Sequence, residues 1–153
     1  GGIITTDWDN EGTSLDESIK ITVRFLTNEI RSDGIRIIVH SEYISERSNP
    51  LRKRFFFSYR ITIQNKGELP AKLLSRYWNI TDAKGNVEEV RGPGVIGQQP
   101  RLEKGESFDY TSFCPLRTEF GVMHGKFHMI RDNGQKFDVI IKPFKLAAPF
   151  SVN

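Results

Sequence analysis

The side chains that most often bind metals or act as nucleophiles are scarce, with three histidines and one cysteine in 153 residues. His124 and His128 lie four residues apart, which suits two ligands of one metal ion only on a helix. The alternation of apolar and polar residues at 123–129 instead predicts a strand, along which four residues span about 13 Å. We therefore expect no metal site, although the sequence leaves open an approach by His40 from another strand.

Catalytic motifs are also missing from the sequence. It contains neither the G-x-S-x-G turn of serine hydrolases nor the H-E-x-x-H helix of zinc proteases. Cys114 precedes Pro115 near the end of an aromatic segment, where we expect it to be a small buried hydrophobic residue. The adjacent carboxylates of Glu88 and Glu89 point to opposite faces of a strand. We expect neither an enzyme nor a cofactor, while an acid–base pair assembled in space stays open.

Residues 92–97, Gly-Pro-Gly-Val-Ile-Gly, match the G-x-G-x-x-G pattern of dinucleotide-binding loops. In those loops a helix follows directly and its N-terminus holds the pyrophosphate, but residues 98–101 begin no helical pattern. Pro93 also removes a backbone N–H that an anion would need. We predict a tight connection between strands in which glycine takes a positive φ angle. The alternative is an anion-binding loop beside Arg91 and Arg101.

Three large side chains, Phe56, Leu73 and Tyr77, are predicted on the faces opposite to the main apolar sides of their strands. They form either a partner-binding patch or additional core at the corners of the fold. Sheet edges offer a second binding route, through addition of a strand. The candidate residues for binding a partner or ligand are Phe56, Leu73, Tyr77, Arg91, Gly92, Gly94, Gly97 and Gln98.

Composition indicates a soluble globular chain with 37% hydrophobic and 27% charged residues. The net charge of +3 is modest, and the basic run at residues 52–54 is typical of a solvated strand entry, so we expect no nucleic-acid partner. No apolar run approaches the roughly 20 residues of a membrane helix. The single cysteine excludes an internal disulfide and fits an intracellular location, in cytoplasm or nucleus. Weak self-association is left open.

Period-two alternation runs through nearly the whole chain and predicts about eight strands joined by turns. We expect a connection at 28–34, a Gly-Pro loop at 92–97 and a hairpin about Asn133-Gly134. The predicted core includes Phe25, Phe57, Tyr59, Trp78 and Phe127. The predicted strands cover residues 19–25, 35–39, 55–64, 73–80, 87–91, 107–114, 121–131 and 135–142.

Residues 1–17 lack this alternation and are predicted to form a linker or N-terminal tail. Trp8 either anchors that tail on the domain or lies in solvent. The remaining residues, 18–150, are predicted to form one domain without an internal boundary, because no repeat or low-complexity segment interrupts them.

Five segments in this order resemble the ApaG family, also called domain of unknown function 525, and the resemblance runs from about Ser18 to Pro149. The segments are 75–85 (SRYWNITDAKG), 89–100 (EVRGPGVIGQQP), 104–112 (KGESFDYTS), 121–127 (GVMHGKF) and 137–144 (FDVIIKPF). The resemblance implies an all-β sandwich of the immunoglobulin or fibronectin-III kind. It also implies that no enzymatic activity is established for the domain.

The family occurs as small bacterial proteins linked genetically to cobalt tolerance and magnesium efflux, and as a C-terminal domain of eukaryotic proteins that include F-box substrate receptors of ubiquitin ligases. Tyr77 stands where bacterial members typically have His, and residues 83–94 look most like the F-box branch. Phe113 departs from the small residue that often follows the Thr-Ser pair. The expectation is therefore a non-catalytic protein-interaction module of an F-box-type protein.

Two other functions compete with that expectation. One is a small-ligand or anion sensor that uses the loop at 91–97, linked to divalent-cation homeostasis as in bacterial ApaG proteins. The other is an enzyme, for which the motifs are missing. Specific partners recovered in a pull-down favour the first function, and saturable thermal stabilisation by a ligand favours the second.

Overall fold

The computed structural model describes residues 3–7, 22–30 and 33–151. These residues form an all-β sandwich of two antiparallel sheets, which confirms the predicted fold class. Within them the only helical segments are two single 3₁₀ turns, Ser45–Arg47 and Pro50–Arg52. No helix in the described part of the chain has the length and hydropathy needed to cross a bilayer.

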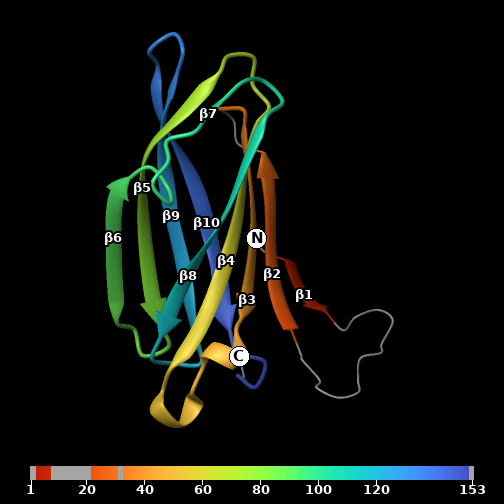
Figure 1. The fold of residues 1–153 in the computed structure, drawn as a ribbon, viewed down its shortest axis with the longest axis vertical. Coiled ribbons are helices and arrows are strands. Elements are labelled where there is room, and N and C mark those ends of the chain that lie inside the picture. The colour runs from red at the N-terminus through yellow and green to blue at the C-terminus, as the bar shows by residue number, and fades with distance from the viewer. Residues whose placement is uncertain (1–2, 8–21, 31–32, 152–153) are drawn as a thin grey trace.

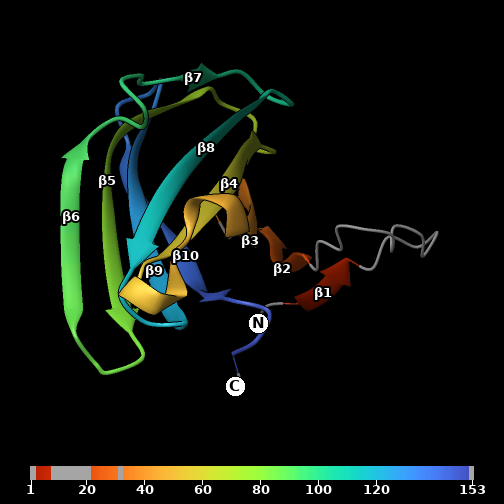
Figure 2. The ribbon, with the colours of Figure 1, turned by 60° about the horizontal axis from the view of Figure 1, so that its bottom comes forward.

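The first sheet has the strand order β1-β2-β3-β4-β8. Its strands are β1 (Ile3–Asp7), β2 (Thr22–Ile30), β3 (Ile35–Tyr43), β4 (Phe55–Asn65) and β8 (Ser107–Leu116). The second sheet has the order β10-β9-β5-β6, and β7 pairs with the first residues of β5. Its strands are β5 (Ala71–Asp82), β6 (Val87–Pro93), β7 (Arg101–Leu102), β9 (Phe120–Arg131) and β10 (Lys136–Ala147). Figures 1 and 2 show the two sheets as separate layers, with β6 at the edge of the second.

The core lies between the inner faces of the sheets. Phe57, Tyr59, Trp78 and Phe127 are buried there as predicted, whereas the side chain of Phe25 lies outside the described residues. The Trp78 ring meets the rings of Tyr59 and Phe127 edge-on, with centroids 5.5 and 6.2 Å away. Burying each such side chain stabilises the fold by about 1.5–3 kcal/mol, so this aromatic cluster is a major part of what holds the layers together.

Gly125 allows β5 and β9 to approach closely beside this cluster. A Cβ atom at Gly125 would lie 2.0 Å from the carbonyl oxygen of Tyr77 and 3.0 Å from Cε3 of Trp78. No larger residue fits that space without moving the backbone. The glycine in the middle of β9 therefore marks where Trp78 packs across its neighbouring strand.

The structure differs from the sequence-based expectation at several strand boundaries. β2 continues to Ile30 through residues expected to be a connection, because Asn28 and Ile30 pair through their backbones with Ile38 and Arg36 of β3. Backbone pairing needs no apolar side chains, so this polar stretch gave no strand signal. β1 lies in the predicted tail and pairs with β2, and the two-residue β7 was also not predicted. Trp8 lies outside the described residues.

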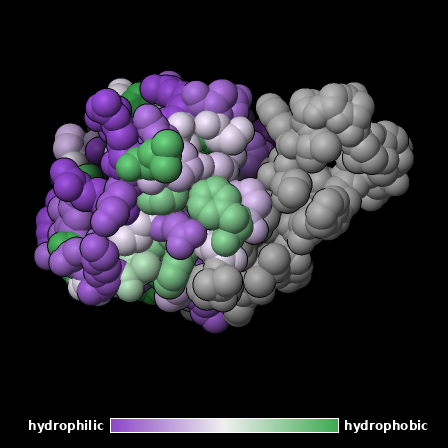
Figure 3. Space-filling view, turned by 90° about the horizontal axis from the view of Figure 1, so that it is seen from below, coloured by the Kyte–Doolittle hydropathy of each residue, from purple (hydrophilic) through white to green (hydrophobic). Residues whose placement is uncertain are grey.

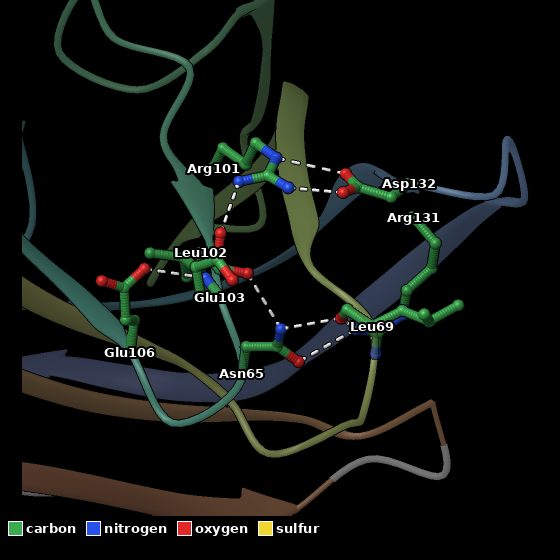
Figure 4. A network of polar contacts seen from close by, with 8 residues as sticks. All are labelled: Asn65, Leu69, Arg101, Leu102, Glu103, Glu106, Arg131 and Asp132. Carbon is green, nitrogen blue, oxygen red and sulfur yellow. Dashed lines mark hydrogen bonds and ion pairs between the residues drawn. The ribbon is translucent and has the colours of Figure 1, made fainter.

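A polar network holds three turns together at one end of the sandwich (Figure 4). The buried guanidinium of Arg131 donates to Oδ1 of Asn65 at 2.9 Å, to the carbonyl oxygen of Leu69, and to the carbonyl oxygen of Asp33 at 2.5 Å. Nδ2 of the fully buried Asn65 donates to the carbonyl oxygens of Leu69 and Leu102. These bonds satisfy a buried charge with carbonyl oxygens.

The opposite end of the sandwich carries exposed apolar side chains. Leu51 is 97% exposed and Phe150 is 51% exposed, although the Phe150 ring also contacts Tyr43 and Phe55. Figure 3 looks onto this end and shows apolar side chains in its centre with polar ones around them. Isolated exposed apolar residues are common on soluble proteins and need no special role.

Candidate functional site

The outer face of the β10-β9-β5-β6 sheet carries a row of polar and charged side chains. Tyr77 of β5 stands opposite Arg91 of β6 on one side and opposite Lys126 of β9 on the other. One pair further along, Ser75 of β5 stands opposite His128 of β9, which stands opposite Asp138 of β10. Side chains directly opposite on one face of a sheet are close neighbours, so four strands contribute to one surface.

A groove of about 330 Å³ is hollowed into this face. Its walls combine three permanent cations with one carboxylate, one histidine and a tyrosine ring. The residues that line it are Ser75, Arg76, Tyr77, Arg91, Gly92, Lys126, His128 and Asp138.

Arg91 is held at the rim of the groove by an aromatic ring. Its guanidinium carbon lies 4.5 Å from the centroid of the Tyr77 ring, a cation–π contact. The Tyr77 hydroxyl donates a hydrogen bond to the carboxylate of Glu89, which fixes the ring. Among the described residues no carboxylate forms an ion pair with Arg91. Its planar set of N–H donors therefore remains available to a ligand.

Asp138 organises the other wall of the groove. Its Oδ1 lies 2.8 Å from Nδ1 of His128, and its Oδ2 lies 3.5 Å from Nζ of Lys126. The hydrogen bond from His128, followed by the charge of Lys126, lowers the pKa of Asp138 below its usual value. The carboxylate is therefore ionised at neutral pH and orients the imidazole of His128 and the ammonium of Lys126 at the surface.

Arg76 ties the glycine motif to the edge of the sheet. Its Nη1 donates to the carbonyl oxygens of Pro93 at 3.1 Å and Gly94 at 3.0 Å. The side chain passes over Gly92, where a Cβ atom would come within 2.9 Å of Nη1. A side chain at position 92 would therefore displace the Arg76 guanidinium from its present path.

The rest of the motif forms a tight turn, as predicted. Gly94 has φ +61°, and a Cβ atom there would lie 2.3 Å from the carbonyl oxygen of Gln98. Val95 and Gln98 exchange two backbone hydrogen bonds around Ile96 and Gly97. The N–H groups of Gly94, Val95 and Gln98 are thus used within the fold, and no helix follows the motif. This geometry lacks the features of a dinucleotide-binding loop.

The three large side chains predicted as one binding patch do not share a surface. Leu73 is fully buried, so it belongs to the core, and its assignment as a candidate binding residue is wrong. A β-bulge between Leu73 and Ser75 inserts one extra residue, and the alternation counted from Tyr77 back to Leu73 therefore assigns Leu73 to the wrong face. Phe56 lies on the outer face of the other sheet, stacked on Phe113 with ring centroids 5.5 Å apart and with Arg47 4.3 Å above it.

The described residues with nucleophilic or metal-binding side chains do not form a recognisable catalytic or metal-binding arrangement. Cys114 is buried, and burial raises the pKa of its thiol to about 12, so the thiol stays protonated. No group of three or more metal-ligating side chains occurs in the described part of the chain. Ser75, His128 and Asp138 lie in a row of the types found in hydrolase triads, but no hydrogen bond joins Ser75 to the imidazole in the structure.

Among the residues that line this groove, sequence reasoning named Tyr77, Arg91 and Gly92 as binding candidates. It considered His128 only as a metal ligand and did not name Lys126 or Asp138 as candidates. The missing signal was the strand register. The Asn133-Gly134 turn pairs Arg131 with Gln135, and counting outward from that pair places His128 opposite Asp138.

Fold and site together define a two-sheet β-sandwich domain with a basic groove on the outer face of one sheet. The family model described as the ApaG domain matches residues 45–131. A second model, a domain of unknown function (DUF3576), matches residues 1–54. The chain belongs to the ApaG domain family.

This chain aligns with nearly the whole length of several similar proteins. Protein ApaG of Anaeromyxobacter dehalogenans (strain 2CP-C) is 53% identical over 122 residues, which are 80% of this chain and 96% of the relative. Protein ApaG of Pseudomonas syringae pv. tomato is 48% identical over 119 residues, 78% of this chain and 94% of the relative. The crystal structure of an ApaA protein from Bordetella pertussis superposes with a TM-score of 0.75 at 45% identity, over 76% of this chain and 95% of that one. These comparisons do not show the predicted resemblance to the F-box branch.

Proposed function

We propose that the domain is a non-catalytic recognition module that binds a partner protein through the groove-bearing outer face of the β10-β9-β5-β6 sheet. The observation that carries this proposal is the stack of Arg91 on Tyr77 at the groove rim, with centroid distance 4.5 Å. Tyrosine and arginine are the residue types most enriched where binding energy concentrates in protein interfaces. Here both are held in place before binding, which lowers the entropy lost on association.

The rigid surroundings of the groove support recognition more than chemistry. The groove lies on strands of the sandwich, and Arg76 clamps the neighbouring loop through two hydrogen bonds to its carbonyl oxygens. The one buried thiol has a pKa of about 12, and it is absent from the groove lining. A preformed surface of this kind supplies shape and charge without an activated nucleophile.

The first experiment compares partner capture by two matched double variants. Arg91→Glu with Tyr77→Ala removes the cation–π pair at the groove, and Arg47→Glu with Phe56→Ala removes the corresponding pair on the opposite sheet. The immobilised domains are incubated with lysate of the source cells, and bound proteins are quantified by mass spectrometry. We expect the groove variant to lose the specifically bound proteins at least tenfold, and the control variant to retain them.

The thermal midpoint should be nearly the same in both variants, because all four side chains are at least partly exposed. Equal capture by the groove variant and the wild type would show that the surface is wrongly assigned. Turnover of an activated ester by the purified domain, lost in Ser75→Ala, would show that the domain is an enzyme.

The cellular setting of this recognition role is a separate prediction. Membership of an F-box-type ubiquitin-ligase receptor, in cytoplasm or nucleus, rests on Tyr77 and residues 83–94 alone, because the relatives compared are bacterial ApaG proteins. The alternative is a sensor of a small ligand or anion in divalent-cation homeostasis. It uses the same groove, and the two functions differ in what fills that groove.

A further inference from the structure

We propose that the groove on the β10-β9-β5-β6 sheet holds one oxyanion group, a phosphate monoester or inorganic phosphate, between Arg91, Lys126 and His128. The inference rests on the proposed function, because that function makes the outer face of the β10-β9-β5-β6 sheet the binding surface. It goes beyond that function because it names the chemical group that the surface recognises.

The placement of the cations carries the first step. Arg91 and Lys126 stand on either side of Tyr77 in register, and neighbouring strands lie about 4.8 Å apart. Both side chains are long and exposed. The Arg91 guanidinium lies over the Tyr77 ring, and the Lys126 ammonium lies 3.5 Å from Oδ2 of Asp138 on β10. Both charges line the same groove, which favours a ligand with two or more negative charges.

The second step is the supply of hydrogen-bond donors. The Arg91 guanidinium is stacked on Tyr77, which leaves its N–H edge free to bind two oxygens of a phosphate. Lys126 contributes an ammonium group, and Ser75 contributes a hydroxyl on the neighbouring strand. Nδ1 of His128 donates to Asp138, so Nε2 is the nitrogen left for a ligand, and it donates to an oxyanion when the imidazole is protonated.

Asp138 opposes this role electrostatically, because it is an anion in the groove, while it orients Lys126 and His128 of β9. It lies 2.8 Å from the His128 ring and 3.5 Å from the Lys126 ammonium, and it is ionised at neutral pH. The three permanent cations of the groove nevertheless outnumber it. Removing its charge without changing its shape should therefore strengthen oxyanion binding.

The test titrates the ¹⁵N-labelled domain with inorganic phosphate at constant ionic strength, with chloride as the reference anion. We expect saturable shifts of the amides at 75–77, 91–92 and 126–128 in the wild type. Arg91→Gln with Lys126→Gln should weaken phosphate binding at least tenfold, whereas Asp138→Asn should strengthen it several-fold. Arg60→Gln with Arg117→Gln, two exposed arginines outside the groove, is the matched control and should bind as the wild type.

Phosphate shifts that are absent, or equal in the groove variant and the control variant, would overturn the inference. A second titration with phosphoserine and phosphotyrosine peptides and their unphosphorylated forms separates the two sources of the group. Tighter binding of a phosphopeptide than of free phosphate assigns the oxyanion to a protein partner, and equal or weaker binding assigns it to a small ligand. Partner capture that depends on Arg91 and Tyr77 without any phosphate binding would leave the recognition role intact and exclude the oxyanion.

Discussion

Single residues decide the shape of the glycine loop beside the groove. Ile96 has a positive φ of 41° and Gly97 a positive φ of 77°, which together define the type I′ geometry of a two-residue hairpin turn. A β-branched residue is strained in that conformation, because its Cβ substituents crowd the backbone. Ile96 is also 52% exposed, so packing offsets little of the strain.

Replacing Ile96 by asparagine should therefore stabilise the domain. Asparagine tolerates positive φ, and Asn-Gly is the preferred pair for a type I′ turn, so we expect the free energy of unfolding to rise by roughly 1 kcal/mol. Urea denaturation measures this change. Ile96→Val keeps the β-branch and should leave stability nearly unchanged. An asparagine variant no more stable than the valine variant would show that the turn is not strained at this position.

For single residues, the sequence predicted local backbone conformation better than the face of the sheet on which a side chain lies. The glycine motif was interpreted correctly as a tight turn with glycine at positive φ, because a missing helix and Pro93 are visible in the sequence. Leu73 was placed on the wrong face, because one bulged residue shifts the alternation and leaves no compositional mark. Asp138 was overlooked because the register of the predicted hairpin was not counted outward from its turn. Lys126 was overlooked because its place beside Tyr77 depends on the pairing of β9 with β5, which are distant in sequence.

At the scale of secondary-structure elements, the side chain of Arg131 connects the ends of several strands. Its guanidinium bonds link the turn before β3, the turn between β4 and β5, and the end of β9. Gly34 and Gly67 make room for it, since a Cβ atom at Gly67 would lie 2.8 Å from Nη2. The element ends are therefore fixed by one buried side chain rather than by separate local turn signals.

Arg131→Met should destabilise the domain strongly. The substitution leaves Oδ1 of Asn65 and the carbonyl oxygens of Leu69 and Asp33 without this donor, and we expect a loss of about 3 kcal/mol in the free energy of unfolding. Arg101→Met at the same end breaks only exposed ion pairs with Glu103 and Asp132, and should cost less than about 1 kcal/mol. Chemical denaturation of both variants tests the difference. Similar losses in the two variants would contradict this account of the network.

At the scale of the whole molecule, the alternation of apolar and polar residues predicts a β-sandwich but does not predict the order of the strands in each sheet. Every strand predicted from period-two patterning is present, since a half-buried strand must alternate. Which outer faces meet a partner depends on the order β10-β9-β5-β6 and β1-β2-β3-β4-β8, which separates Tyr77 from Phe56. That order is set by long-range pairing, for which a single sequence carries little signal.

The central claim is that the groove face, and not the opposite face with Phe56 and Phe113, meets the partner. The most direct measurement is amide chemical-shift mapping of the labelled domain on addition of the purified partner recovered by capture. The account predicts that the largest shifts fall at 75–77, 91–94 and 126–128. Largest shifts at 56–60 and 111–115 on β4 and β8, or no saturable shifts at all, would contradict it.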